Sequence, residues 1–144
     1  MTLSCGDWKL FVTWTIEREN GADLDVDEVL GVYRSSGLGE RRPIADEERF
    51  TEMVRNANLI LTCRDADALV GIARSVSDFC YVTYLSDIAV NREYQRSGIG
   101  KALIEATRKQ APRAKIVLLS APAATGYYPH IGFSRHDSAW VLAP

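Results

Sequence analysis

Cysteine is scarce in this sequence, and long hydrophobic runs are missing from it. The three cysteines form no C-x-x-C pair and are odd in number, which argues against a disulfide framework and favours reduced thiols. The first residues lack the basic start and apolar core of a secretory signal, and no apolar stretch is long enough to span a bilayer. These absences predict a cytoplasmic protein without a membrane partner.

An excess of charge of one sign is missing too. The formal net charge of the 144 residues is -2, so the chain has no general attraction for phosphate polymers, and nucleic acid is not an expected partner. Any phosphate-bearing ligand must therefore be held by a local site. No spacing of His, Cys, Asp and Glu is typical of a metal site. The length and the 47% hydrophobic content predict one globular domain over residues 1–144.

Hydrophobic periodicity predicts an ordered series of strands and helices. Strands are expected at 10–16, 59–63, 69–76, 81–90, 115–120 and 133–142. Helices are expected from the Asp25 cap to Gly37, around Phe50 as far as Asn56, over 98–110, and as one or two turns within 123–131. This order predicts a mixed α/β fold of the α+β kind, with a mostly antiparallel sheet, helices on both faces, and one parallel pair around the long helix.

The clearest chemical signal lies where a strand passes through a short polar loop into the long helix. Gly98 and Gly100 stand at the start of that helix. Free N–H groups at a helix start point outward with the positive end of the macrodipole, and glycines let a phosphate approach the backbone. The spacing fits neither a P-loop nor a dinucleotide fingerprint. The segment therefore predicts an anion site suited to a pyrophosphate.

Two motifs in this chain resemble those of the GNAT acyltransferase superfamily. The pattern Gln95-x-x-Gly98-x-Gly100 is similar to the family's acyl-CoA pyrophosphate motif, and residues 127–133 are similar to its aromatic-Tyr-x-x-x-Gly-Phe signature. The order of elements resembles the family along nearly the whole chain. The family often has an Asn ahead of the second motif, whereas this chain has Ala and Pro at 121–124. The resemblance implies a GNAT-like fold and acetyl-CoA as co-substrate.

The same resemblance assigns the contacts to acetyl-CoA. The backbone of the strand end at 88–90 would bond the pantetheine arm like an added strand and polarise the thioester carbonyl, although a plain core strand is the alternative reading. The N–H groups of the following loop and first helical turn would cradle the pyrophosphate. The expected cofactor-binding residues are Ile88, Ala89, Val90, Gln95, Arg96, Ser97, Gly98, Ile99, Gly100 and Lys101.

Two side chains are candidates for proton transfer. Tyr128 occupies the position of the family's general acid, and a phenol can protonate the departing thiolate; an aromatic packed on the sheet is the alternative. Asp87 is the only charged side chain between Phe79 and Val90, and a carboxylate in an apolar strand is costly unless paired or used. It is a candidate base if burial raises its pKa toward neutrality. A structural carboxylate bonded to a neighbouring turn or bulge explains it equally well.

The predicted reaction is direct attack of a primary amine on acetyl-CoA in a ternary complex, without a covalent enzyme intermediate. The acceptor is a small-molecule or peptide amine that the sequence does not identify. A non-catalytic acyl-CoA-binding or sensor domain is the alternative function, and a coincidental Gly-x-Gly turn in an interaction domain is a third. Arg41 and Arg42 lie on a loop that helps form the acceptor side in the resembling family, where solvated charge is the simpler explanation. A homodimer is expected by analogy with the fold alone.

Overall fold

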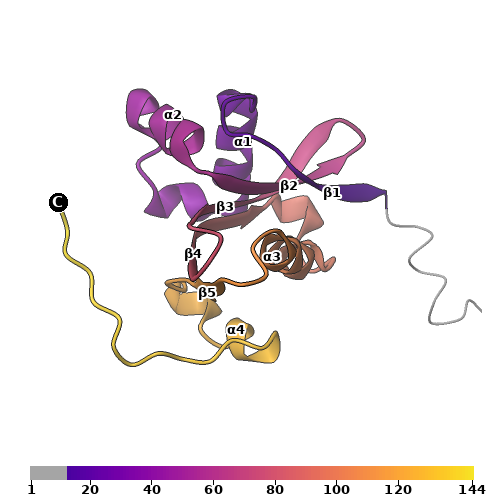
Figure 1. Cartoon of the computed structure of the whole chain (residues 1–144). Coiled ribbons are helices and arrows are strands. Elements are labelled where there is room, and N and C mark those ends of the chain that lie inside the picture. The colour runs from indigo at the N-terminus through magenta and orange to yellow at the C-terminus, as the bar shows by residue number, and fades with distance from the viewer. Residues whose placement is uncertain (1–12) are drawn as a thin grey trace, which may run out of the picture.

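The computed structural model describes residues 13–144, which are organised around one five-stranded sheet (Figure 1). The strands lie in the order in which they occur in the chain. They are β1 (Trp14–Arg18), β2 (Leu59–Asp65), β3 (Ala68–Ser77), β4 (Val82–Val90) and β5 (Lys115–Val117). The neighbours from β1 to β4 pair antiparallel, whereas β4 and β5 pair parallel. The predicted meander and its single parallel pair are therefore confirmed.

Helices cover both faces of this sheet, as the sequence predicted. Figure 1 shows α1 (Val26–Ser36) and α2 (Glu47–Asn56) on one side, with α3 (Ile99–Gln110) and the short α4 (Tyr127–His130) on the other. The starts of α1 and α2 follow from their caps, because the Asp25 and Asp46 side chains accept backbone N–H bonds of the first turns. Short 3₁₀ turns occupy Leu38–Arg41, Arg92–Tyr94 and Pro122–Ala124.

The core consists of two apolar layers, one on each face of the sheet. Tyr33, Phe50 and Ile72 belong to the layer under α1 and α2, whereas Leu61 and Leu103 belong to the layer under α3. The side chains of β2 and β3 are buried on both faces, which explains why these strands are almost continuously apolar.

Glycine at position 71 brings α3 close to the sheet. A Cβ atom on Gly71 would lie 3.1 Å from Ile99 Cγ2 and 3.3 Å from Leu103 Cδ1, so a larger residue would push the helix outward. The start of α3, which carries the predicted anion site, is thus held tightly against β3.

A bulge in β4 lies close to the end of its pairing with β5. Leu85 pairs with Ser75 and Asp87 pairs with Arg74, so Ser86 is an extra residue in β4. Pairing with β5 ends at Tyr84, opposite Val117. Bulges bend the strand that carries them. Within residues 13–144, no strand pairs with the remainder of β4 on this side, so its main-chain edge is free beside the start of α3.

The predicted strand at 133–142 is wrong, because these residues form no strand. Trp140, Val141 and Leu142 are 92%, 75% and 98% exposed, and Figure 1 shows the segment running alone to the C-terminus. Polar residues at 134–138 include a turn, which leaves only a short apolar run for pairing. Two other strands differ in extent. The strand predicted at 115–120 ends at Val117, and residues 10–12 of the first predicted strand lie outside the described residues.

Candidate active site

The loop after β4 is anchored at both of its ends. Asn91 N–H donates to the Val70 carbonyl at 2.8 Å, and Gln95 Nε2 donates to the Val90 carbonyl at 3.0 Å. The Tyr94 hydroxyl donates to Asp65 Oδ2 at 2.6 Å. These bonds tie the loop to the ends of β2, β3 and β4. Gln95 thus holds the end of the loop against the last residue of β4.

The N-terminus of α3 is electropositive and open. Gly98 caps the helix with φ 86°, and no side chain caps it in turn. The Ser97 hydroxyl instead donates back to the Tyr94 carbonyl. The first intrahelical bond runs from Ala102 N–H to the Gly98 carbonyl, so the N–H groups of the preceding turn have no helical acceptor. Arg96, which also has a positive φ of 65°, adds charge beside them.

This helix start differs from the other two long ones. The first turns of α1 and α2 carry acidic side chains and aspartate caps, whereas the first turn of α3 contains no acidic residue. A Cβ atom on Gly98 would meet no atom within 4 Å, which leaves space at the cradle. Ile99 is buried and offers only its main chain, while Lys101 is exposed. The arrangement can hold an anion through backbone N–H groups and nearby positive charge.

The main chain of Ile88, Ala89 and Val90 lies on the free edge of β4. The opposite edge of β4 is paired with β3, where Ala89 lies opposite Ile72. Ala89 is buried, whereas Ile88 and Val90 are half-buried against the layer under α3. An extended ligand could add to this edge through main-chain hydrogen bonds. The structure thus brings the two predicted backbone sites, the β4 edge and the α3 cradle, into one continuous stretch.

Two tyrosines of α4 lie on the same side of the sheet as α3. Tyr128 is half-buried, and its ring forms edge-to-face contacts with Tyr127 and Phe133, both with centroids 5.4 Å apart. Burial raises the pKa of Tyr128 above its usual value, and the neighbouring Tyr127 adds to this. The phenol is therefore protonated at neutral pH, as a proton donor must be. The Tyr127 hydroxyl lies nearer the cradle, 3.7 Å from where a Cβ atom on Gly100 would stand.

Asp87 is buried in an ionic cluster, which corrects the expectation about its pKa. Its carboxylate is inaccessible to solvent and accepts from Arg42 Nε at 2.5 Å and Arg74 Nε at 2.6 Å. The Tyr33 hydroxyl donates to it at 2.6 Å. Burial alone would raise the pKa of Asp87, but the charge of Arg74 and the bonds from Tyr33, Arg74 and Arg42 outweigh it and hold the pKa below its usual range. An ionised carboxylate with both oxygens engaged is poorly suited to collect a proton from an amine.

Comparison with known proteins decides the family. A family model described as an acetyltransferase (GNAT) domain matches residues 29–141. The chain belongs to the GNAT acetyltransferase family. A chloroplastic GCN5-related N-acetyltransferase of Arabidopsis thaliana is 26% identical, with 79% of this chain and 52% of the relative covered. A probable acetyltransferase of Glycine max is 35% identical, with 83% and 53% covered. The chain thus spans about half the length of these curated relatives.

Solved structures show the same GNAT fold. A GNAT-family acetyltransferase from Streptococcus pneumoniae superposes with a TM-score of 0.70 at 22% identity, covering 91% of this chain and 99% of that one. An aminoglycoside N-acetyltransferase in complex with CoA superposes with a TM-score of 0.66 at 16% identity, covering 91% and 94%. At such identities the likeness establishes the fold.

Sequence reasoning missed most of the cluster around Asp87 in this GNAT chain. Arg74 interrupts the apolar strand β3 as Asp87 interrupts β4, so the same signal was available for both residues. Tyr33 reads as an ordinary apolar position of the α1 stripe. The sequence does not distinguish Arg42 from Arg41 as loop charge, but the structure does, because Arg41 is exposed and Arg42 reaches the cluster.

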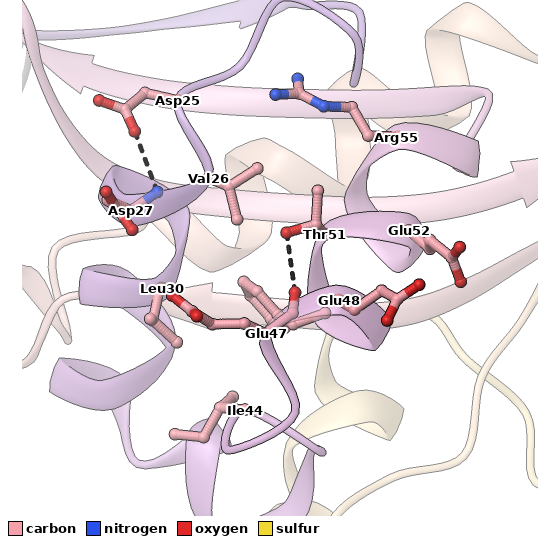
Figure 2. Close-up of a pocket in the computed structure, with 11 residues that line it drawn as sticks. Asp25, Val26, Asp27, Leu30, Ile44, Glu47, Glu48, Thr51, Glu52 and Arg55 are labelled. Atoms are coloured by element: carbon pink, nitrogen blue, oxygen red, sulfur yellow. Dashed lines mark hydrogen bonds between the residues drawn. The ribbon is translucent and has the colours of Figure 1, made fainter.

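A hollow of this GNAT chain lies on the face of the sheet opposite α3. Figure 2 shows a groove between α1 and α2, with a volume of about 610 Å³. Apolar residues such as Leu30 and Ile44 meet acidic ones there, among them Asp27, Glu47 and Glu48. The acidic residues stand in the first turns of their helices, where they stabilise the helix dipoles. Their positions are explained without a ligand.

The described part of the chain contains neither a group of side chains that could bind a metal ion nor a helix that could span a membrane. Between residues 13 and 144, no three His, Cys, Asp or Glu side chains gather in a way that could hold a metal ion. No helix in this range has the length and apolar character needed to cross a membrane.

Proposed function

We propose that this GNAT protein is an acetyl-CoA-dependent N-acetyltransferase that moves an acetyl group onto a primary amine. The observation that carries the proposal is the opening between β4 and β5 beside the uncapped start of α3. A free strand edge suits the amide-containing pantetheine arm, and the adjoining N–H groups suit a pyrophosphate. Family membership supports the same reading.

Acetyl-CoA would be held mainly by main-chain groups. Ile88, Ala89 and Val90 would pair with the pantetheine arm, and the segment from Gln95 to Lys101 would surround the pyrophosphate. The open space at Gly98 fits this assignment, because no protein atom lies within 4 Å of the position that a Cβ atom would take. The co-substrate would supply an acetyl group already activated as a thioester.

The proposed chemistry is a direct transfer. The neutral amine nitrogen attacks the thioester carbonyl carbon, an N–C bond forms, the C–S bond breaks, and the CoA thiolate leaves. Tyr128 donates a proton to this thiolate, and water takes the proton that the amine loses. Main-chain N–H groups of the β4 edge polarise the carbonyl. Asp87 is not assigned the role of base, because its pKa is lowered and both of its oxygens already accept hydrogen bonds.

The acceptor is proposed only as a primary amine on a small molecule or a peptide. One relative, from Glycine max, is named as a histone acetyltransferase, whereas some structural neighbours are named as aminoglycoside acetyltransferases. These names cover protein and small-molecule amines alike. The single-domain span of 1–144, the homodimer and the cytoplasmic location stay predictions, and the chloroplastic designation belongs to the Arabidopsis relative.

A calorimetric titration with acetyl-CoA tests the proposal first, with NADH and ATP as controls. Selective binding of acetyl-CoA is expected. Release of CoA is then followed with three amines: spermidine, an aminoglycoside and a lysine-containing peptide. Binding without turnover on any of these amines would favour the acyl-CoA-binding or sensor alternative. Absence of binding would reject both functions.

A matched pair of variants tests the proposed acid. Tyr128→Phe should lower kcat by about 100-fold, within the usual span for general acid catalysis, and leave the Kd of acetyl-CoA nearly unchanged. Tyr127→Phe removes the neighbouring hydroxyl and should leave kcat within about threefold of the starting protein. If Tyr127→Phe caused the larger loss of kcat, the acid would be Tyr127.

A further inference from the structure

The bulge at Ser86 lies just beyond the point where β4 stops pairing with β5. Pairing between the two strands ends at Tyr84, two residues before the bulge. Beyond it, β4 continues to Val90 with a free edge. Because a bulge bends its strand and redirects the residues that follow, the width of the opening depends on how firmly Ser86 is held. The groups that contact Ser86 and Asp87 are therefore relevant to acyl transfer at this opening.

Three segments outside β4 hold the bulge. The Ser86 carbonyl accepts from Arg42 Nη2 at 2.9 Å, and the Ser86 hydroxyl accepts from Arg74 Nη2 at 2.9 Å. Asp87, the next residue, accepts from both arginines and from Tyr33. Tyr33 belongs to α1 and Arg74 to β3, and both are buried in regular elements. Arg42 alone comes from the loop that joins α1 to α2.

We propose that Arg42 is a positioning residue that fastens this loop, residues 37–46, to the β4 bulge and thereby sets the geometry of the opening between β4 and β5. Among the described residues, Arg42 makes the only side-chain hydrogen bonds between the loop and β4. Its guanidinium bridges two acceptors on adjacent residues, a carboxylate and a main-chain carbonyl. A planar fork of donors suits such bridging, and a lysine cannot reproduce it. The proposal rests on the proposed acetyl transfer.

The cluster has more positive than negative groups, so Arg42 can be replaced without leaving Asp87 unpaired. The cluster contains two guanidinium groups and one carboxylate, so removing Arg42 leaves Asp87 paired with Arg74 at 2.6 Å. The Arg42 side chain is also 22% exposed, so its loss opens no sealed cavity. Removing Asp87 would instead leave two arginines without their carboxylate. Arg42 variants are therefore expected to fold.

Arg41 provides the matched control. It is adjacent, exposed, and carries the same charge, and among the described residues its side chain makes no hydrogen bond to β4. Arg42→Ala and Arg41→Ala thus change the net charge equally. With the best amine of the panel, Arg42→Ala should lower kcat by about 10- to 100-fold, because small misplacement of reacting groups is costly. The KM for acetyl-CoA should stay within about threefold, since the cradle at α3 is untouched. Arg42→Lys should restore only part of kcat, and Arg41→Ala should retain all of it.

Hydrogen exchange gives a readout that does not need turnover. Arg42→Ala should exchange faster in peptides from residues 37–46 and 82–90, with α3 peptides unchanged, whereas Arg41→Ala should match the starting protein. The inference is overturned if Arg42→Ala keeps its kcat, if Arg41→Ala loses as much, or if exchange at 82–90 is unaltered. If no amine turns over, exchange alone decides. The two proposals fail by different results. The proposed function is rejected if the starting protein does not bind acetyl-CoA, whereas the role of Arg42 is rejected if Arg42→Ala turns over normally.

Discussion

Replacing Gly98 by alanine probes the cradle at the single position where the backbone conformation and the proposed ligand contact coincide. Gly98 has φ 86°, in the left-handed region, where a residue with a Cβ atom is strained by about 1–2 kcal/mol. The new methyl group meets no protein atom within 4 Å, so no internal clash adds to this. Alanine also restricts the unfolded chain, which raises the free energy of unfolding by about 0.5 kcal/mol and offsets part of the strain. The net loss of stability is about 1 kcal/mol, or a lowering of Tm by about 3–4 °C for this size.

The effect on acetyl-CoA should be larger than this modest loss of stability suggests. The methyl group would occupy open space beside the N–H groups to which we assign the pyrophosphate, and relief of the strain would reorient the N–H groups of the first turn of α3. We expect these two effects to weaken binding by at least about 1.4 kcal/mol, which corresponds to a tenfold rise in the Kd. Calorimetry gives the Kd, and thermal unfolding without ligand gives the Tm.

Gly31 is the control for this substitution. It lies within α1, its φ is not positive, and a Cβ atom there also meets nothing within 4 Å. Gly31→Ala should therefore raise stability by about 0.5–1 kcal/mol and leave the Kd unchanged. If Gly98→Ala bound acetyl-CoA as tightly as Gly31→Ala does, the pyrophosphate would lie elsewhere. If it raised Tm, the assigned backbone conformation of Gly98 would be refuted.

Three further predictions concern stability. The pKa of Asp87 is lowered in the folded state from an ordinary value of 3.8, so its stabilising contribution is present above that pH and is lost as the pH falls below it. Asp87→Asn should lower the free energy of unfolding by about 3–5 kcal/mol at pH 7. As the pH is lowered below about 4, the free energy of unfolding in urea should fall less steeply for this variant than for the starting protein; an identical fall would contradict the pairing. Phe50→Ala should lower the free energy of unfolding, measured in urea, by about 3–5 kcal/mol because Phe50 is 1% exposed. A loss below about 1 kcal/mol would argue against its burial. Gly21→Ala should unfold at a much lower temperature, since a Cβ atom would stand 2.0 Å from the Val54 carbonyl oxygen; a Tm near that of the starting protein would show that the two segments are farther apart.

Much of the fold follows from local sequence patterns. The aspartates at 25 and 46 cap α1 and α2 through bonds within their own first turns, so those helix starts are readable from a few residues. The β2 to β4 meander follows from apolar runs separated by short turns. The open start of α3 also depends on neighbouring residues alone, because Gly98 and the lack of acidic residues in the first turn are both local features. These are short-range effects, and the sequence expresses them directly.

The predicted strand at 133–142 shows where local pattern is insufficient. An apolar run becomes a strand only if a neighbouring strand satisfies its main-chain groups, and residues 139–142 have no such neighbour among residues 13–144. Pairing partners are distant in sequence, so an isolated pattern does not specify them. The bulge at Ser86 is another such case, since it exists only in the register between β3 and β4.

The sequence by itself determined the family motifs, the order of elements as far as α4 and the uncapped start of α3, because each depends on residues within a few positions of one another. Tertiary structure alone decided the state of Asp87 and the difference between Arg41 and Arg42. Asp87 is paired with groups 13, 45 and 54 residues away, and its pKa is the balance between the burial that they create and the charge that they bring. Such a balance is a property of the assembled cluster, and no single segment of the chain contains it.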